Sequence, residues 1–165
     1  MQEILNNFSE MIQSMDTLSK TLMTALISMI PVIELRGALP IAMHAGLPWY
    51  LAYPAAVIGN MLPLPFIVMF IRKIFNFLKA KTKLGGIVAR LETRAEKKMP
   101  SIRKYEFWGL AVFVAIPLPG TGGWTGALIA AMMDMRLKKA LPSIFIGVLL
   151  AGAVVTLLAY GLGSL

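Results

Sequence analysis

The chain has 165 residues, of which 58% are hydrophobic and only 15% are charged, and it contains no cysteine. An ordinary soluble domain carries about 45–50% apolar and about 25% charged residues, so this composition excludes a disordered chain and argues against a soluble enzyme. Without cysteine, the chain has no disulfide scaffold, no cysteine–zinc site and no thiol chemistry.

The net charge of +8 is concentrated in one segment. Eleven of the sixteen Lys and Arg residues lie between Arg72 and Lys104, whereas the rest of the chain balances its bases with acids. Membrane proteins place such an excess of basic residues in their cytoplasmic loops. We therefore predict a multi-pass protein of the inner (plasma) membrane with this segment in the cytoplasm, and we expect no binding to nucleic acid.

Four segments follow one another along the chain. Residues 1–20 repeat apolar side chains at helical spacing, which predicts an interfacial amphipathic helix. This segment is acidic overall, whereas a signal peptide begins with basic residues, so we expect it to be retained. Two apolar tracts, 21–71 and 107–165, are separated by the basic and amphipathic segment 72–106. Each tract exceeds fifty residues, and a spanning helix needs about 20.

Both apolar tracts are interrupted by proline and glycine, the first at 31–40 and the second at 117–126. The arm before the first interruption is short, because residues 23–33 span roughly 16 Å as a helix, about half of the hydrocarbon core. Basic residues flank the second interruption on both sides, so a full crossing there would place one basic cluster outside. We predict a re-entrant hairpin in each tract; the alternative is a pair of kinked spans.

A complete span follows each hairpin, at about Trp49–Ile71 and about Ala140–Gly161. The two tracts also share sequence. Residues 37–43 match 126–132 at five of seven positions, residues 54–59 match 142–147 at Pro, Ile and Gly, and Ile-Pro at 30–31 matches 116–117. One hairpin and one span cross the membrane once, so the second copy is predicted to be inverted and both termini external. Inverted repeats with broken helices are typical of transporters.

The first interruption carries Glu34 and Arg36, the only charged residues between Lys20 and Arg72. A charge at the bilayer centre costs about 2.5–3.5 kcal/mol on insertion scales, so each needs a partner or water. One interpretation is a self-neutralising ion pair that fixes the hairpin. The other makes Glu34 a proton site, with Arg36 beside a helix that begins near Gly37 and binds an anionic group. Pro40 ends the same motif.

The second interruption is rich in glycine and has no charge. Glycines let the backbone approach a ligand or another helix closely, and packing alone would also require them. Tryptophan usually lies at the membrane interface, so its place here is consistent with a cavity-lining or a core role. The candidate binding residues of this interruption are Pro117, Pro119, Gly120, Gly122, Gly123, Trp124 and Gly126.

The motif Glu34-Leu-Arg-Gly-Ala-Leu-Pro40 and the motif Pro117-Leu-Pro-Gly-Thr-Gly122 with Trp124 resemble the small multi-drug export protein family. That family is similar, distantly, to the DedA (VTT-domain) membrane proteins. The resemblance implies two inverted re-entrant hairpins, each beside a spanning helix, and movement of lipid carriers or lipid scrambling, with proton coupling. It places Glu34 in the acidic position and Arg36 in the basic position. DedA proteins usually carry a further acid and arginine in the second hairpin, which this chain lacks.

These observations predict an all-α integral membrane protein built from an inverted repeat of a re-entrant helical hairpin and a transmembrane helix. We expect a proton-coupled transporter, not an enzyme, that exports or flips an anionic amphiphile or lipid-linked phosphate. Its partners are that substrate, protons, membrane lipids and a second copy of the chain, and no cofactor or metal is expected. The alternatives are a passive lipid scramblase and a structural membrane component in which Glu34 and Arg36 only form an ion pair.

Overall fold

The computed structural model describes residues 14–71, 86, 89–90, 93, 105–118 and 120–161, and within these ranges every regular element is helical. The prediction of an all-α protein is therefore confirmed for the described residues. The chain divides into two compact units, one formed by Met1–Leu62 with Ala151–Leu165 and the other by Pro63–Leu150. We call them unit 1 and unit 2. Most of the predicted segments 1–20 and 72–106 lies outside the described residues.

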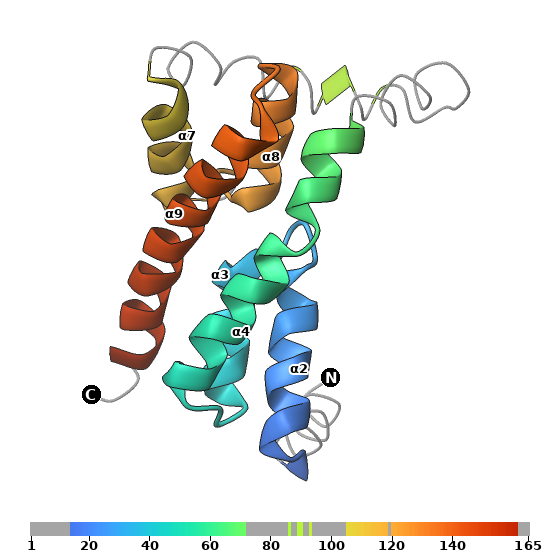
Figure 1. Cartoon of the computed structure of the whole chain (residues 1–165). Helices are drawn as coiled ribbons and strands as arrows, with labels where there is room; N and C mark the ends of the chain where they lie inside the picture. Colours follow the sequence, from blue (N-terminus) through green and yellow to red (C-terminus); the bar gives the residue numbers. More distant parts are fainter. Residues whose placement is uncertain are drawn as a thin grey trace. The chain divides into compact units, whose positions relative to one another are not determined.

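Unit 1 contains three successive helices that pack on one another, α2 (Thr17–Ser28), α3 (Glu34–His44) and α4 (Trp49–Met61) (Figure 1). Because α2 already begins at Thr17, the end of the predicted interfacial segment 1–20 belongs to the first hairpin. The break between α2 and α3 is also shorter than predicted. It ends at Glu34 rather than near Gly37, and Pro40 lies inside α3.

The contact between α2 and α4 is close and includes a polar bond. The Ser28 hydroxyl is fully buried and donates a hydrogen bond of 2.6 Å to the backbone carbonyl of Ala56. One turn earlier in α2, the carbonyl of Ala25 lies directly against Gly59 of α4. Small residues on both helices allow the two backbones to approach, as in other membrane helix pairs.

Unit 2 contains α7 (Glu106–Ala115), α8 (Gly123–Met132) and the first part of α9 (Leu137–Thr156). The buried Ser143 hydroxyl of α9 donates to the carbonyl of Phe107 in α7 over 2.5 Å. A methyl group at Gly147 would lie 2.6 Å from the carbonyl oxygen of Ala111. The closeness of α7 and α9 therefore depends on small residues as well.

The backbone at the end of α3 recurs at the end of α8, 88 residues later. The amide of Leu47 donates to Ala42 as that of Met135 donates to Ala130, over 3.0 and 2.9 Å. Gly46 and Asp134 both adopt the left-handed conformation, with φ of 71° and 54°. The backbone bonds relate the two copies by an offset of 88 residues. The matched sequence block 37–43 and 126–132 has an offset of 89, so the sequence alignment and the backbone correspondence differ by one residue. The inversion of the two copies stays a prediction.

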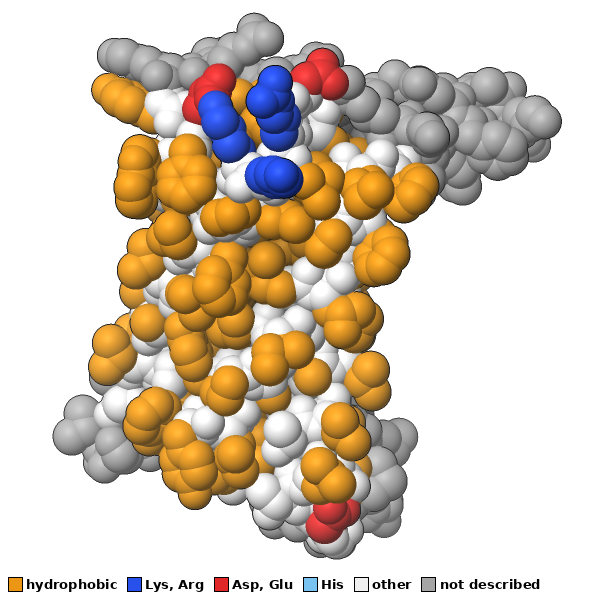
Figure 2. Space-filling view, viewed as in Figure 1, with side chains coloured by type: hydrophobic (Ala, Val, Ile, Leu, Met, Phe, Trp, Pro, Cys, Tyr) orange, Lys and Arg blue, Asp and Glu red, His pale blue; other side chains and the backbone are white. Residues whose placement is uncertain are grey.

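Two helical stretches are long and apolar enough to cross a membrane, Trp49–Ile71 and Leu137–Gly161. The first agrees with the predicted span, although Leu62 and Pro63 interrupt its helix, and the second begins three residues before the predicted Ala140. Large apolar side chains are exposed along the surface, and Figure 2 shows hydrophobic side chains over most of the visible face. Soluble monomers rarely expose so much contiguous apolar surface, so this surface indicates contact with lipid.

Candidate functional site

Glu34 occupies an unusual position at the start of α3. Its φ of 51° is left-handed, which is uncommon for a residue other than glycine, and its backbone amide donates to the carbonyl of Ile30 over 2.9 Å. The residue is only 6% exposed, so Glu34 is a buried acid. Backbone strain of this kind costs about 1–3 kcal/mol and concentrates at functional sites.

Arg36 lies in the same turn of α3 and is half-buried. Two residues separated by one other point to opposite sides of a regular helix. Glu34 has a left-handed backbone at the first position of α3, and its side chain nevertheless interacts electrostatically with that of Arg36. The structure therefore brings the predicted acid and base together.

The other two predicted residues of α3 have packing roles. A Cβ atom at Gly37 would collide with Cγ2 of Ile33, so glycine is needed for the tight turn that carries Glu34. Pro40 is tolerated inside the helix, and its carbonyl lies 2.8 Å from Nδ1 of His44. Both residues shape the hairpin, and their part in binding stays a prediction.

A cavity of about 530 Å³ lies in unit 1, between the beginning of α4 and the C-terminal end of α9 with the π-helix η1 (Leu157–Gly161). A methyl group at Gly152 of α9 would lie 2.8 Å from Cε2 of Tyr53 and 3.2 Å from Cδ1 of Leu35. Gly152 therefore lets α9 approach both Tyr53, which lines the cavity, and Leu35 of α3. The residues that line the cavity are Trp49, Tyr53, Ala153, Thr156, Leu157, Tyr160 and Gly161.

The lining of this cavity is mostly apolar and aromatic, and three of its residues carry hydroxyl groups, Tyr53, Thr156 and Tyr160. The Tyr160 hydroxyl is engaged, because it donates a hydrogen bond of 2.8 Å to the carbonyl of Leu47. The Thr156 hydroxyl is buried and has no hydrogen-bond partner within the described ranges. Pockets of this size and composition suit an apolar or amphiphilic molecule. Periodicity could not reveal this chamber, because its walls come from segments one hundred residues apart.

Asn60 is a further polar residue that the sequence analysis did not single out. Its side chain is fully buried in α4, and neither amide atom finds a hydrogen-bond partner in the part of the chain that the structure describes. Polar groups buried within membrane segments are expensive and are usually functional. The available signal was composition, since Asn60 is the only asparagine in the tract 21–71.

The second predicted interruption lies in unit 2, and the side chain of Thr121 bridges backbone groups of its turn. The sequence did not predict a role for Thr121. The buried Thr121 hydroxyl is placed to donate to the carbonyls of Ile116 and Leu118, at 2.6 and 2.8 Å. Gly120 has a φ of 82°, a conformation that favours glycine. Gly122 caps α8 and Gly123 begins it, while Gly126 packs against Val114. Glycine here therefore serves the turn and helix packing.

The remaining predicted residues of this interruption differ in how exposed they are and in whether the structure describes them. Pro117 is exposed, Trp124 is half-buried near the start of α8, and Pro119 lies outside the described residues. The first set of candidates belongs to unit 1 and the second to unit 2, and each is described within its own unit. Among the described residues, no group of His, Cys, Asp and Glu has the arrangement of a metal site.

A family model described as "putative small multi-drug export protein" matches residues 34–154. The match begins at Glu34, within the first interruption, and ends in α9, so it includes the second interruption, the candidate span Trp49–Ile71 and most of the span Leu137–Gly161. The resemblance noted from the sequence motifs is thereby confirmed, whereas similarity to DedA proteins stays a prediction. No curated protein and no solved structure matches the chain.

Proposed function

The chain belongs to the small multi-drug export protein family, and on this premise we propose that it is a small membrane transporter of amphiphilic molecules. The transported molecule is an anionic amphiphile or a lipid-linked phosphate, and its movement is coupled to protons at Glu34. The observation that carries this proposal is a buried carboxyl group on a strained turn, with a half-buried arginine in the same turn, in a unit that also contains an apolar cavity. The role is transport rather than catalysis, and it uses no cofactor.

The chemistry of unit 1 supports this assignment of roles. Arginine binds phosphate and carboxylate groups through a planar fork of donors, so Arg36 is suited to hold an anionic head group. The aromatic cavity of the same unit is suited to hold the apolar part of an amphiphile. Proton exchange at Glu34 would alter the charge that Arg36 meets, which links the proton to the binding of the anion.

The organisation of the protein belongs to the same proposal. The two copies are inverted relative to each other, in a DedA-like arrangement of re-entrant hairpins. The segment 72–106 lies on the cytoplasmic side of the inner membrane and both termini lie outside. Because one chain supplies few membrane-embedded helices, the transporting form is a dimer.

The test is transbilayer movement of a fluorescent phosphatidylglycerol in liposomes that contain the purified full chain, with and without a pH gradient. Wild-type protein should move the lipid faster in the presence of the gradient. Glu34→Gln retains shape but cannot exchange a proton, so it should lose the gradient-driven component. Asp16→Asn, which changes an exposed acid before α2, is the matched control and should behave as wild type.

The outcomes separate the proposal from its two alternatives. Movement that ignores the gradient in wild type and in Glu34→Gln would identify a passive scramblase. Loss of the folded protein in both Glu34→Gln and Arg36→Ala, with no lipid movement in wild type, would identify a structural ion pair. Gradient-driven movement retained in Glu34→Gln would show that the proton binds elsewhere.

A further inference from the structure

A second cavity, of about 480 Å³, lies in unit 2 where α7 begins and α8 ends. Figure 2 shows acidic and basic side chains together at this end, above a surface of hydrophobic side chains. Its lining combines two acids, two bases and two thioethers. The lining residues are Glu106, Met133, Asp134, Met135, Arg136 and Lys139. We call it the charged cavity.

The charges in this cavity are balanced rather than of one sign. Lys139 Nζ lies 3.3 Å from Glu106 Oε2, which forms an exposed ion pair at the rim. Arg136 is the second base of the lining and Asp134 is the second acid. An ion of either sign would meet a group of its own sign here. A molecule that carries both charges would meet complementary partners.

The first copy of the repeat shows that the fold does not require these charges. At the offset of 88 residues, Asp134, Arg136 and Lys139 correspond to Gly46, Pro48 and Leu51, and the same backbone hydrogen bonds are formed. The left-handed position is glycine in the first copy, where it is unstrained. The second copy places aspartate there at a conformational cost of roughly 1 kcal/mol. The backbone of this loop therefore does not depend on charges at these three positions.

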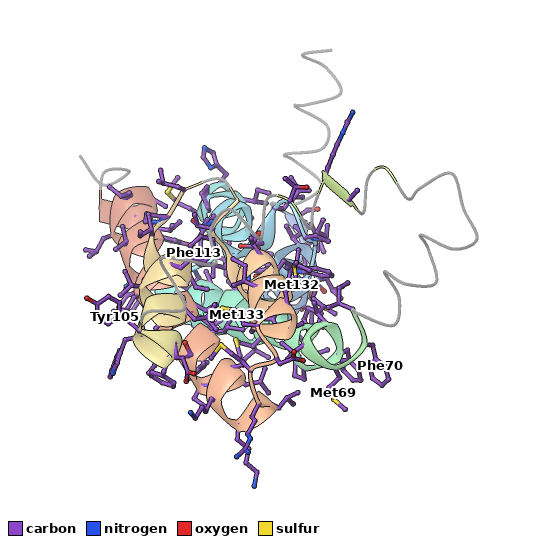
Figure 3. All side chains as sticks on the ribbon, turned by 90° about the horizontal axis from the view of Figure 1, so that it is seen from above. Met69, Phe70, Tyr105, Phe113, Met132 and Met133 are labelled. Atoms are coloured by element: carbon purple, nitrogen blue, oxygen red, sulfur yellow. The ribbon has the colours of Figure 1, made fainter. Side chains whose placement is uncertain are left out.

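Aromatic residues indicate the depth of the cavity in the membrane. Tyr105 and Trp108 flank Glu106 and are 62% and 63% exposed. Such amphipathic rings are enriched at the level of the lipid head groups. In Figure 3, seen from above, Met132 and Met133 at the end of α8 lie between Tyr105 on one side and Phe70 on the other. The exposed aromatic residues near Glu106 therefore indicate that the charged cavity lies near the level of the lipid head groups.

We propose that the charged cavity binds a zwitterionic group that joins a phosphate to an ammonium, supplied by the head group of a phospholipid such as phosphatidylethanolamine. Arg136 binds the phosphate through its fork of donors, and Asp134 accepts from the ammonium. The Lys139–Glu106 pair closes the rim without adding net charge. This site is independent of Glu34, so it stands or falls separately from the proposed transport.

The experiment measures lipid binding to the purified full chain by native mass spectrometry, with three lipids of identical acyl chains. Phosphatidylethanolamine carries both charges, phosphatidylglycerol lacks the ammonium, and a trimethylammonium-propane lipid lacks the phosphate. The binding that Arg136→Gln removes reports on the charged cavity. In that part, phosphatidylethanolamine should bind about tenfold more tightly than either of the others, because each missing charge forfeits a charge-assisted hydrogen bond. Soluble glycerophosphoethanolamine is the fourth probe and separates a lipid from a free zwitterion.

Three variants assign the charges. Asp134→Gly restores the residue of the first copy, so it should fold normally and bind phosphatidylethanolamine no better than phosphatidylglycerol. Arg136→Gln should lower phosphatidylethanolamine binding to the level of the lipid without phosphate. Lys138→Gln removes a neighbouring exposed base that does not line the cavity, and it should leave the preference unchanged.

Two results would overturn the proposal. One is phosphatidylethanolamine binding that is the same in wild type, Asp134→Gly and Arg136→Gln, which would place the bound lipid outside the charged cavity. The other is an equal loss in Lys138→Gln and Arg136→Gln. Soluble glycerophosphoethanolamine that binds as tightly as the lipid would support the head-group chemistry and assign the ligand to solution.

Discussion

The α-carbon of Gly59 lies against the carbonyl oxygen of Ala25, so closely that no side chain fits between α4 and α2. Glycine inside a helix normally costs about 0.5–1 kcal/mol relative to alanine. Here that cost is offset by the contact of two helix backbones, and the same relationship joins Gly147 to Ala111 in unit 2.

Gly59→Ala and Gly147→Ala should each destabilise the protein, although alanine is the better helix former. The added methyl meets backbone atoms that cannot move alone, so each variant should lose about 1–3 kcal/mol of unfolding free energy. Thermal unfolding in detergent measures the loss. Gly161→Ala is the control, because nothing lies within 4 Å of its new methyl and its stability should be unchanged. Equal stability of all three variants would contradict the close helix approach.

Ser28→Ala tests the polar bond between α2 and α4. The variant loses the hydrogen bond to Ala56 and should destabilise the protein by about 1 kcal/mol. Thr21→Ala is a matched control on the same helix, since the Thr21 hydroxyl donates to Thr17 of its own helix over 2.8 Å. Bonds of that kind add little to helix stability. If Thr21→Ala costs as much as Ser28→Ala, the bond between the helices contributes nothing special.

Features that depend on neighbouring residues in the sequence, such as apolar stretches and helix breaks, could be predicted from the sequence. The two spanning stretches follow from runs of apolar residues, and the hairpin breaks follow from proline and glycine. The sequence predicts that the helix after the first break begins near Gly37, whereas α3 begins three residues earlier, at Glu34. A helix that begins there requires a left-handed glutamate, which local propensity disfavours. Packing around the turn overrides that preference.

The parts of the candidate site that were missed depend on contacts between distant segments. Tyr160 reaches Leu47 across 113 residues of sequence, and the cavity beside this bond has no local signature. Asn60 looks like any isolated polar residue until its complete burial is known. Composition could nominate Glu34 and Arg36 because charge is rare in the tract. It could not show that a strained backbone holds them together.

The predicted topology rests on the positive charge between Arg72 and Lys104, and single cysteines can test it in this cysteine-free chain. A membrane-impermeant maleimide added to intact cells should label Ser164→Cys but not Thr82→Cys. Permeabilised cells should label both, which controls for access to the thiol. Labelling of Thr82→Cys from outside would invert the assigned orientation.

Asp16 provides a pH-dependent contact at the start of α2. The Ser19 hydroxyl and backbone amide donate to its carboxylate over 2.5 and 3.3 Å, and these hydrogen bonds lower the pKa of Asp16 below its ordinary value of 3.8. A group with a lowered pKa in the folded state stabilises that state at pH values above the unfolded pKa. The contribution is lost as the pH falls through the folded pKa.

Amide exchange in the first turn of α2 should therefore be slow and constant at neutral pH, and it should increase, after correction for intrinsic exchange, below about pH 4. Asp16→Asn can cap the helix but cannot titrate, so its first turn should lose this dependence on pH while α2 still forms. Asp16→Ala should fray at every pH. Added salt distinguishes two causes of this pH dependence of amide exchange. Salt should change it little if the hydrogen bonds to the carboxylate dominate, and should weaken it if attraction to the helix dipole dominates. A first turn in wild type that is equally protected at pH 3 and pH 7 would show that the cap does not hold α2.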